Sequence, residues 1–96
     1  MQLRPMTNGR ISGTGTVSFA YAATGGMLGG VLISTDGTNA AVVVIRKLTA
    51  SGDVVFDMST ITAQMVIVPV HTDNVAALYY SITGTGAAAM LYEWVN

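Results

Sequence analysis

Short apolar runs separated by polar and Gly-containing turns follow one another along the chain after residue 15, and this pattern predicts strands. The segment Thr16–Tyr21 has a period of two, as expected for a half-buried strand. Further strand-like runs lie at residues 27–34, 40–48, 54–58, 64–70, 75–82 and 87–95. Seven short strands separated by turn signals roughly every 8–12 residues are typical of a β-sandwich or small barrel. The sequence therefore predicts an all-β fold, a small antiparallel β-sandwich of jelly-roll-like or Ig-like type, over residues 16–96.

Residues before the first alternating run have a different pattern. Residues 1–15 contain one proline and several Gly, Thr and Asn residues without clear periodicity, so we predict an extended N-terminal arm. Within the sandwich, the Gly29–Gly30 pair predicts a bulge or a close backbone approach. Pro69 cannot donate to a strand ladder, so the run 64–70 is expected to lie at a sheet edge or to end there.

The composition indicates a subunit of an assembly. Only 9% of the 96 residues are charged and 51% are apolar, whereas an average soluble domain has about 25% charged residues. A domain of this size buries only ~60–70% of the surface of its unfolded chain. Four basic and five acidic side chains cannot cover the remainder. We therefore expect a homo-oligomer.

The run 40–48 also indicates a subunit of an assembly. Arg46 and Lys47 are adjacent near its end, so alternation predicts that one of them points inward, where its charge must pair or reach the rim. The four residues before them (Val42 to Ile45) are all apolar and point alternately to the two faces of the strand, so both faces are apolar. One face can form the core, and the other is expected to be covered by a neighbouring subunit.

Several partner classes are excluded at this level. A net charge of −1 provides no electrostatic basis for nucleic-acid binding, which depends on Lys and Arg contacts to phosphates. The chain has no cysteine, so a disulfide or a Cys-based metal site cannot form. The N-terminus lacks the apolar core of a secretory signal, and no apolar run approaches the ~20 residues of a membrane helix. We expect neither a nucleic-acid nor a membrane partner.

The polar residues do not form a catalytic or metal-binding pattern. His71 and Asp73 share one predicted turn, and no Ser lies in a nucleophile-elbow context that would complete a triad. Oxygen ligands for calcium could come from Asp36, Thr38 and Asn39, but the segment lacks the further carboxylates of a calcium-binding loop. The Asp-Gly pair at 36–37 is typical of a turn, which accounts for these residues without a metal. The sequence therefore predicts a protein that is not an enzyme and uses no cofactor.

Aromatic and basic residues are the candidate contact residues. Tyr79 and Tyr80 are adjacent in a strand and must face opposite sides of the sheet. Tyr92 and Trp94 share a face with Met90. Trp and Tyr are concentrated at protein interfaces, and an exposed pair also suits sugar stacking. The interface candidates are Arg4, Arg10, Tyr79, Tyr92 and Trp94.

The order of these segments resembles a known family. The strand Gly-Met-Leu-Gly-Gly-Val-Leu-Ile-Ser (26–34) is followed by the turn Asp-Gly-Thr-Asn-Ala (36–40) and a valine-rich strand. Then come Ala-Ser-Gly-Asp-Val-Val-Phe-Asp-Met (50–58) and the closing Ala-Met-Leu-Tyr-Glu-Trp-Val (89–95). Over about residues 16–95 this is similar to small all-β virion proteins of tailed bacteriophages, especially capsid decoration (cement) proteins.

The resemblance implies a β-sandwich that binds the outside of an icosahedral shell, often as a trimer, and clamps neighbouring copies of the major capsid protein. Such a protein is made in the host cytoplasm and resides in the virion. Two alternatives stay open at this point. One is a tail, connector or fibre component, and the other is a carbohydrate- or receptor-binding sandwich with Tyr92 and Trp94 as the stacking platform.

Overall fold

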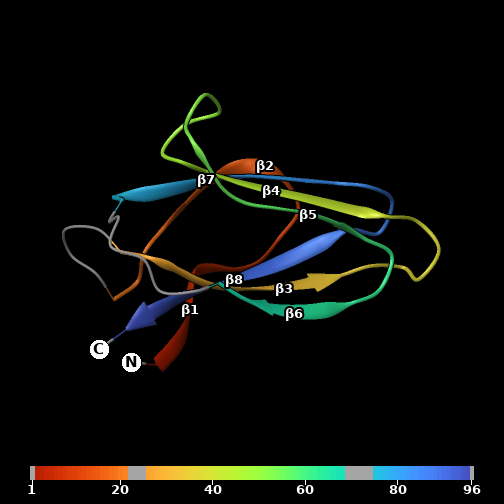
Figure 1. Cartoon of the computed structure of the whole chain (residues 1–96), viewed down its shortest axis with the longest axis horizontal. Helices are drawn as coiled ribbons and strands as arrows, with labels where there is room; N and C mark the ends of the chain where they lie inside the picture. The colour runs from red at the N-terminus through yellow and green to blue at the C-terminus, as the bar shows by residue number, and fades with distance from the viewer. Residues whose placement is uncertain (1, 22–25, 69–74, 96) are drawn as a thin grey trace.

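Two four-stranded antiparallel sheets face each other in the structure (Figure 1). The computed structural model describes residues 2–21, 26–68 and 75–95. Sheet A has the order β1-β8-β3-β6 and sheet B the order β2-β7-β4-β5. The strands are β1 (Gln2–Ile11), β2 (Gly13–Ser18), β3 (Leu28–Ser34), β4 (Ala41–Lys47), β5 (Val54–Thr60), β6 (Gln64–Ile67), β7 (Ala77–Thr83) and β8 (Ala88–Val95). The predicted all-β antiparallel sandwich is confirmed, and each of the seven predicted strands is present.

The strands pair in a nested order. β1 pairs with β8, β2 with β7, β3 with β6, and β4 with β5, all antiparallel. The pairs β3–β8 and β4–β7 join these hairpin-like pairs into the two sheets. This is the order of an eight-stranded jelly roll. Of the two predicted types of sandwich, the structure has the jelly-roll type.

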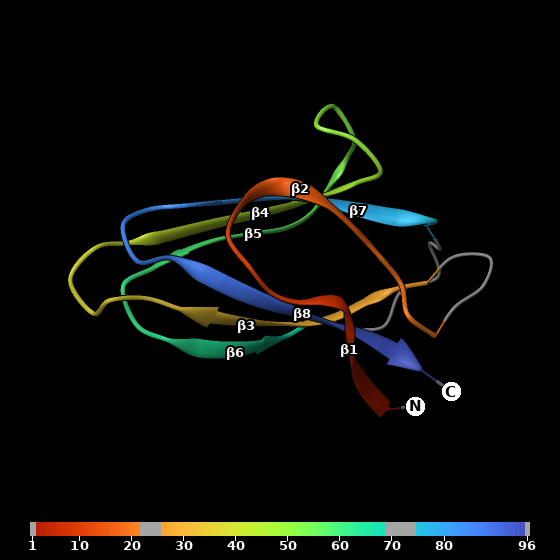
Figure 2. The same cartoon turned by 180° about the vertical axis from the view of Figure 1, so that it is seen from behind.

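The predicted N-terminal arm is wrong for the described residues. Gln2–Ile11 forms β1 and pairs along β8 in sheet A, and the side chains of Met6 and Ile11 are buried in the core. The chain then passes through Ser12 to β2 in sheet B (Figure 2). The apolar–polar period of β1 is obscured in the sequence because its register with β8 shifts between Pro5 and Arg10. An edge strand tolerates such a bulge and a proline, since one side has no ladder partner.

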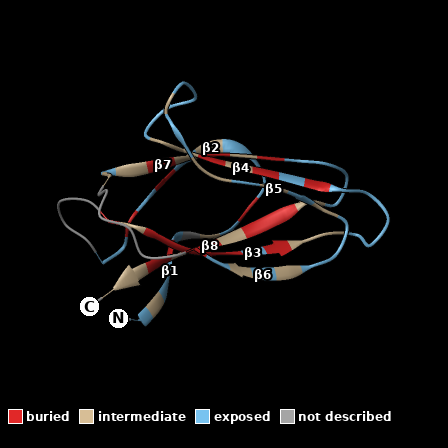
Figure 3. Ribbon diagram, in the orientation of Figure 1, coloured by how far each residue is buried: buried red, intermediate tan, exposed pale blue. Residues whose placement is uncertain are grey.

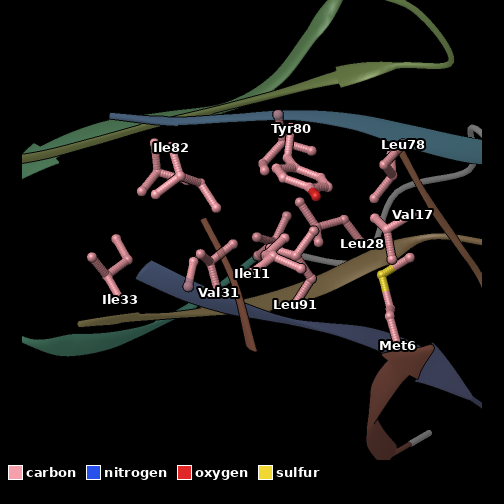
Figure 4. Close-up of a cluster of buried hydrophobic side chains, with 14 of the residues drawn as sticks. Met6, Ile11, Val17, Leu28, Val31, Ile33, Leu78, Tyr80, Ile82 and Leu91 are labelled. Carbon is pink, nitrogen blue, oxygen red and sulfur yellow. The ribbon is translucent and has the colours of Figure 1, made fainter. Parts of the chain in front are cut away.

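The core lies between the sheets. Figure 3 shows buried segments on the central strands, and Figure 4 shows side chains of β7 pointing across at those of β3 and β8. Burying a large aliphatic side chain contributes about 1.5–3 kcal/mol, so this layer is the main source of stability. Its largest fully buried side chains are Leu28, Val31, Ile33, Val43, Ile45, Leu78 and Leu91.

The glycine pair in β3 behaves as predicted. The register between β3 and β8 shifts between Leu28 and Gly30, which is a bulge or irregularity. A Cβ on Gly29 would lie 2.5 Å from Leu3 Cδ2 and 3.0 Å from the backbone nitrogen of Trp94. The described part of the run 64–70 lies at a sheet edge, as predicted, since β6 (Gln64–Ile67) is an edge strand of sheet A. The predicted roles of Pro69, His71 and Asp73 lie outside the described residues.

Candidate interaction surface

The outer face of sheet A consists almost entirely of apolar and aromatic residues. Because residues opposite each other in a sheet point to the same side, the register orders this face into cross-strand rows. The first row runs Arg10, Met90, Leu32, Met65 and the second Pro5, Tyr92, Gly30, Ile67. Leu3 and Trp94 form the third. We call these ten residues the apolar face.

Five residues of the apolar face are exposed, namely Pro5, Arg10 and three large apolar side chains. Leu32 is 37%, Met65 is 39% and Ile67 is 52% exposed, whereas Met90, Tyr92 and Trp94 beside them are half-buried. The apolar face includes one basic residue, Arg10, at the corner next to Met90, and no acidic residue. A solvated outer sheet face is normally polar, so this composition makes the apolar face the candidate interaction surface of the described residues.

Polar atoms of the two aromatic residues are bonded within the chain. The indole Nε1–H of Trp94 donates to the backbone oxygen of Val68 at 2.9 Å, and its backbone N–H donates to the oxygen of Met27 at 3.1 Å. The hydroxyl of Tyr92 lies 3.8 Å from the sulfur of Met90. The rings are therefore held by their own sheet and present mainly carbon to the outside.

The outer face of sheet B has a different composition. Six of its residues carry a hydroxyl on an aliphatic side chain, and Arg46 and Asp57 are charged. By register this face consists of Thr14, Thr16, Ser18, Val42, Val44, Arg46, Val54, Asp57, Ser59, Ala77, Tyr79, Ser81 and Thr83. We call it the hydroxyl face. The hydroxyl groups explain how a chain with so few charges covers this side of the sandwich.

The predicted interface residues are divided among three places. Arg10, Tyr92 and Trp94 lie together on the apolar face, and the predicted sharing of a face by Met90, Tyr92 and Trp94 is confirmed. Tyr79 lies on the hydroxyl face, while its neighbour Tyr80 is buried in the core, as alternation predicted.

Arg4 lies elsewhere, at the end of the sandwich, with its guanidinium 5.7 Å from the ring centroid of Tyr21. Sequence reasoning missed Leu32, Met65 and Ile67 as surface residues. These residues lie in runs that are apolar at every position, Val31-Leu32-Ile33 and Met65-Val66-Ile67, so the sequence cannot show which face points outward.

The two adjacent cations of β4 follow the alternation. Arg46 lies on the hydroxyl face and donates from Nη1 to the backbone oxygen of Gly52 at 3.2 Å. Lys47 is on the inward side at the end of the strand, where it lines a cavity of about 10 Å³ together with Leu28 and Leu78. That volume holds about one water molecule, so this cavity is not a substrate pocket.

The remaining polar candidate is a turn. Oδ1 of Asp36 accepts the backbone N–H groups of Thr38 and Asn39, and Oδ2 accepts the side-chain amide of Asn39. These bonds, led by that from the backbone of Asn39, hold the pKa of Asp36 below its ordinary value. Within residues 2–21, 26–68 and 75–95, no three His, Cys, Asp or Glu side chains gather to hold a metal.

The fold and this surface define the class of the chain as an all-β jelly-roll sandwich with one apolar outer face. Comparison with protein-family models, curated proteins and solved structures found no match to the chain. In the part of the chain that the structure describes, no helix has the length and hydropathy of a membrane span.

Proposed function

We propose that this protein is a structural virion protein of a tailed bacteriophage, which binds the outside of the capsid as an oligomer and stabilises the shell. The observation that carries the proposal is the contrast between the two outer faces. The apolar face lacks the polar side chains that normally solvate an exposed sheet, whereas the hydroxyl face has them. We assign the apolar face to contact with the major capsid protein.

The size of the apolar face supports a shell partner. Four strands about 4.8 Å apart and about five residues of about 3.3 Å each give a footprint of roughly 300 Å². A standard specific interface buries about 800 Å² per partner. One such contact is therefore weak alone, but a trimer carrying three of them onto a symmetric shell gains avidity. Each bound copy then stabilises the assembled shell by mass action.

The single charge of the apolar face fits the same partner. Arg10 is exposed at a corner, opposite Met90 and away from Tyr92 and Ile67. A charge at the rim stays in contact with water and steers the partner without the cost of burial. Tyr92 and Trp94 are residue types that often dominate binding energy when a partner covers them.

The test compares matched variants on the two faces. Ile67→Asp places a carboxylate in the apolar face, and Ser59→Asp places one on the hydroxyl face. Each variant is mixed with shells of the source phage that lack the protein, and occupancy is measured by cryo-electron microscopy. We expect Ile67→Asp to reduce occupancy strongly and Ser59→Asp to bind like wild type. Wild-type occupancy for Ile67→Asp would refute the assignment of this face.

Oligomerisation is tested on the purified protein without shells. The proposal expects a species larger than the 9.9 kDa chain at micromolar concentration, and a trimer in particular. Multi-angle light scattering measures this mass directly. A clean monomer that still decorates shells would remove the oligomer from the proposal and leave the shell contact in place.

A second candidate function is carbohydrate binding, and one observation favours it. Tyr92 and Trp94 lie side by side in neighbouring rows of the apolar face, with their polar atoms already bonded. Adjacent ring faces suit stacking on sugars, and jelly rolls occur in lectins as well as in viral capsids. Retention on a panel of immobilised glycans, lost in Trp94→Ala and kept in Ile67→Asp, would support this function over shell binding.

A further inference from the structure

Glu93 is a charged side chain placed inside the sandwich. It is 0% exposed, the one polar or charged residue of the described chain that is fully buried. It lies on the inward side of β8, with Arg4 of β1 and Leu28 of β3 as its register partners. A carboxylate removed from water in this way must be hydrogen-bonded to be tolerated.

Two consecutive backbone amides provide those hydrogen bonds. The N–H of Ala20 donates to Oε2 of Glu93 at 2.6 Å, and the N–H of Tyr21 donates to Oε1 at 3.1 Å. Ala20 and Tyr21 follow the end of β2, more than 70 positions from Glu93 in the sequence. Hydrogen bonds to a charged acceptor are about twice as strong as neutral ones. One side chain of sheet A therefore holds the segment that leaves sheet B.

This segment carries two aromatic side chains with different environments. Phe19 is buried, and its ring lies so close to Gly26 that a Cβ there would be 2.6 Å from Phe19 Cδ1. Tyr21 is 54% exposed and stacks under the guanidinium of Arg4. Holding the amides of Ala20 and Tyr21 thus keeps Phe19 in the core and Tyr21 against β1.

Two described residues with charged or titratable side chains lie next to Glu93. Arg4 is opposite Glu93 in the register of β1 with β8, and Tyr21 belongs to the segment whose amides Glu93 accepts. The charged member of this pair, Arg4, is a cation. It provides no second carboxylic acid with which Glu93 could share a proton.

We propose that Glu93 is a proton-sensitive latch for residues 19–21. As a carboxylate it presents one accepting oxygen to each amide. When it takes up a proton from solvent, its negative charge is lost and one oxygen becomes a hydroxyl. The hydrogen bonds to Ala20 and Tyr21 then weaken, and the segment with Phe19 opens while the sheets stay paired. This inference does not depend on the proposed virion function.

The test is amide hydrogen exchange followed by NMR, in a titration from neutral pH down to the pH at which the strands unfold together. Rates are converted to protection factors so that intrinsic pH effects cancel. In the wild type we expect protection of the Ala20 and Tyr21 amides to fall roughly ten- to a hundred-fold, the size of a lost charged hydrogen bond. Amides of β4 and β7 should keep their protection over the same range.

Glu93→Gln mimics the protonated state because it keeps the shape and replaces one oxygen with a donor. We expect low protection at Ala20 and Tyr21 at neutral pH, with no further loss on acidification. Asp57→Asn, on the hydroxyl face, is the control and should behave as wild type. The latch is refuted if the wild type keeps full protection at both amides until the strands unfold together. It is also refuted if Glu93→Gln protects them as well as wild type does. If Glu93→Gln does not fold, the wild-type titration alone decides.

Discussion

Replacing Trp94 by alanine tests both the packing of the apolar face and its function. Trp94 is half-buried. Part of its side chain is covered by its own chain, and the rest is available to a protein partner or a sugar. A well-packed aromatic residue buries about 150–250 Å², so we take roughly 100 Å² as covered by its own chain. At about 25 cal/mol per Å² this contributes about 2.5 kcal/mol. The hydrogen bond to Val68 adds about 1 kcal/mol.

The expected destabilisation for Trp94→Ala is therefore about 2–4 kcal/mol, against a total of roughly 5–14 kcal/mol for a domain of this size. Since 1 kcal/mol shifts the Tm of such a domain by about 4–8 °C, the melting temperature should fall by roughly 10–25 °C. Urea denaturation followed by circular dichroism measures the free energy, with the slope unchanged if the denatured state is unaffected. Trp94→Phe keeps a ring but lacks the donor, so it should lose about 1–2 kcal/mol.

A loss below about 0.5 kcal/mol, the size of an ordinary surface effect, would refute the packing of the indole on its own sheet. The functional result is measured on the same variant where it still folds. Shell occupancy should fall if Trp94 is covered by the capsid. Retained occupancy together with lost glycan binding would favour the carbohydrate alternative.

Three further outcomes are expected. Gly29→Ala should cost about 1–3 kcal/mol, because its Cβ would lie 3.0 Å from the backbone nitrogen of Trp94. Gly30→Ala should cost less, because its one close contact is with the flexible end of Met65 and its contact with the Val66 backbone oxygen, at 3.4 Å, is ordinary packing. Chemical denaturation of both variants measures the difference. Deleting residues 1–12 should abolish the β-sheet circular dichroism signal, since it removes a strand with two core residues, each worth about 2–5 kcal/mol, and an intact spectrum would contradict the role of β1. Folding lowers the pKa of Asp36, so its ionised carboxylate stabilises the folded state. This stabilisation should be fully present above the unfolded pKa of Asp36 and should be lost as the pH falls through the folded pKa. The melting temperature of the wild type should therefore fall in acid, and Asp36→Asn should reduce that fall when Tm is measured as a function of pH. An equal fall in the variant would show that another carboxylate causes it.

Local chemistry was enough to predict much of the sandwich. The period of two in Thr16–Tyr21 and the short apolar runs that follow it, each bounded by turn signals, predicted seven strands. Alternation also placed Tyr79 and Tyr80 on opposite faces and Tyr92 with Trp94 on one face. The Gly29–Gly30 bulge was visible because only glycine allows the backbone so close to a neighbouring strand. These features depend on neighbours in the sequence.

Long-range contacts decided the rest. β1 has no clear period because its register shifts between Pro5 and Arg10, and only its pairing with β8 shows that it is a strand. Alternation defines two faces of each strand but not which one points outward, so the exposed Met65 and Ile67 of the apolar face required the sheet order. The burial of Glu93 depends on amides more than 70 residues away. Such placements arise from packing two sheets around one core, which no local pattern encodes.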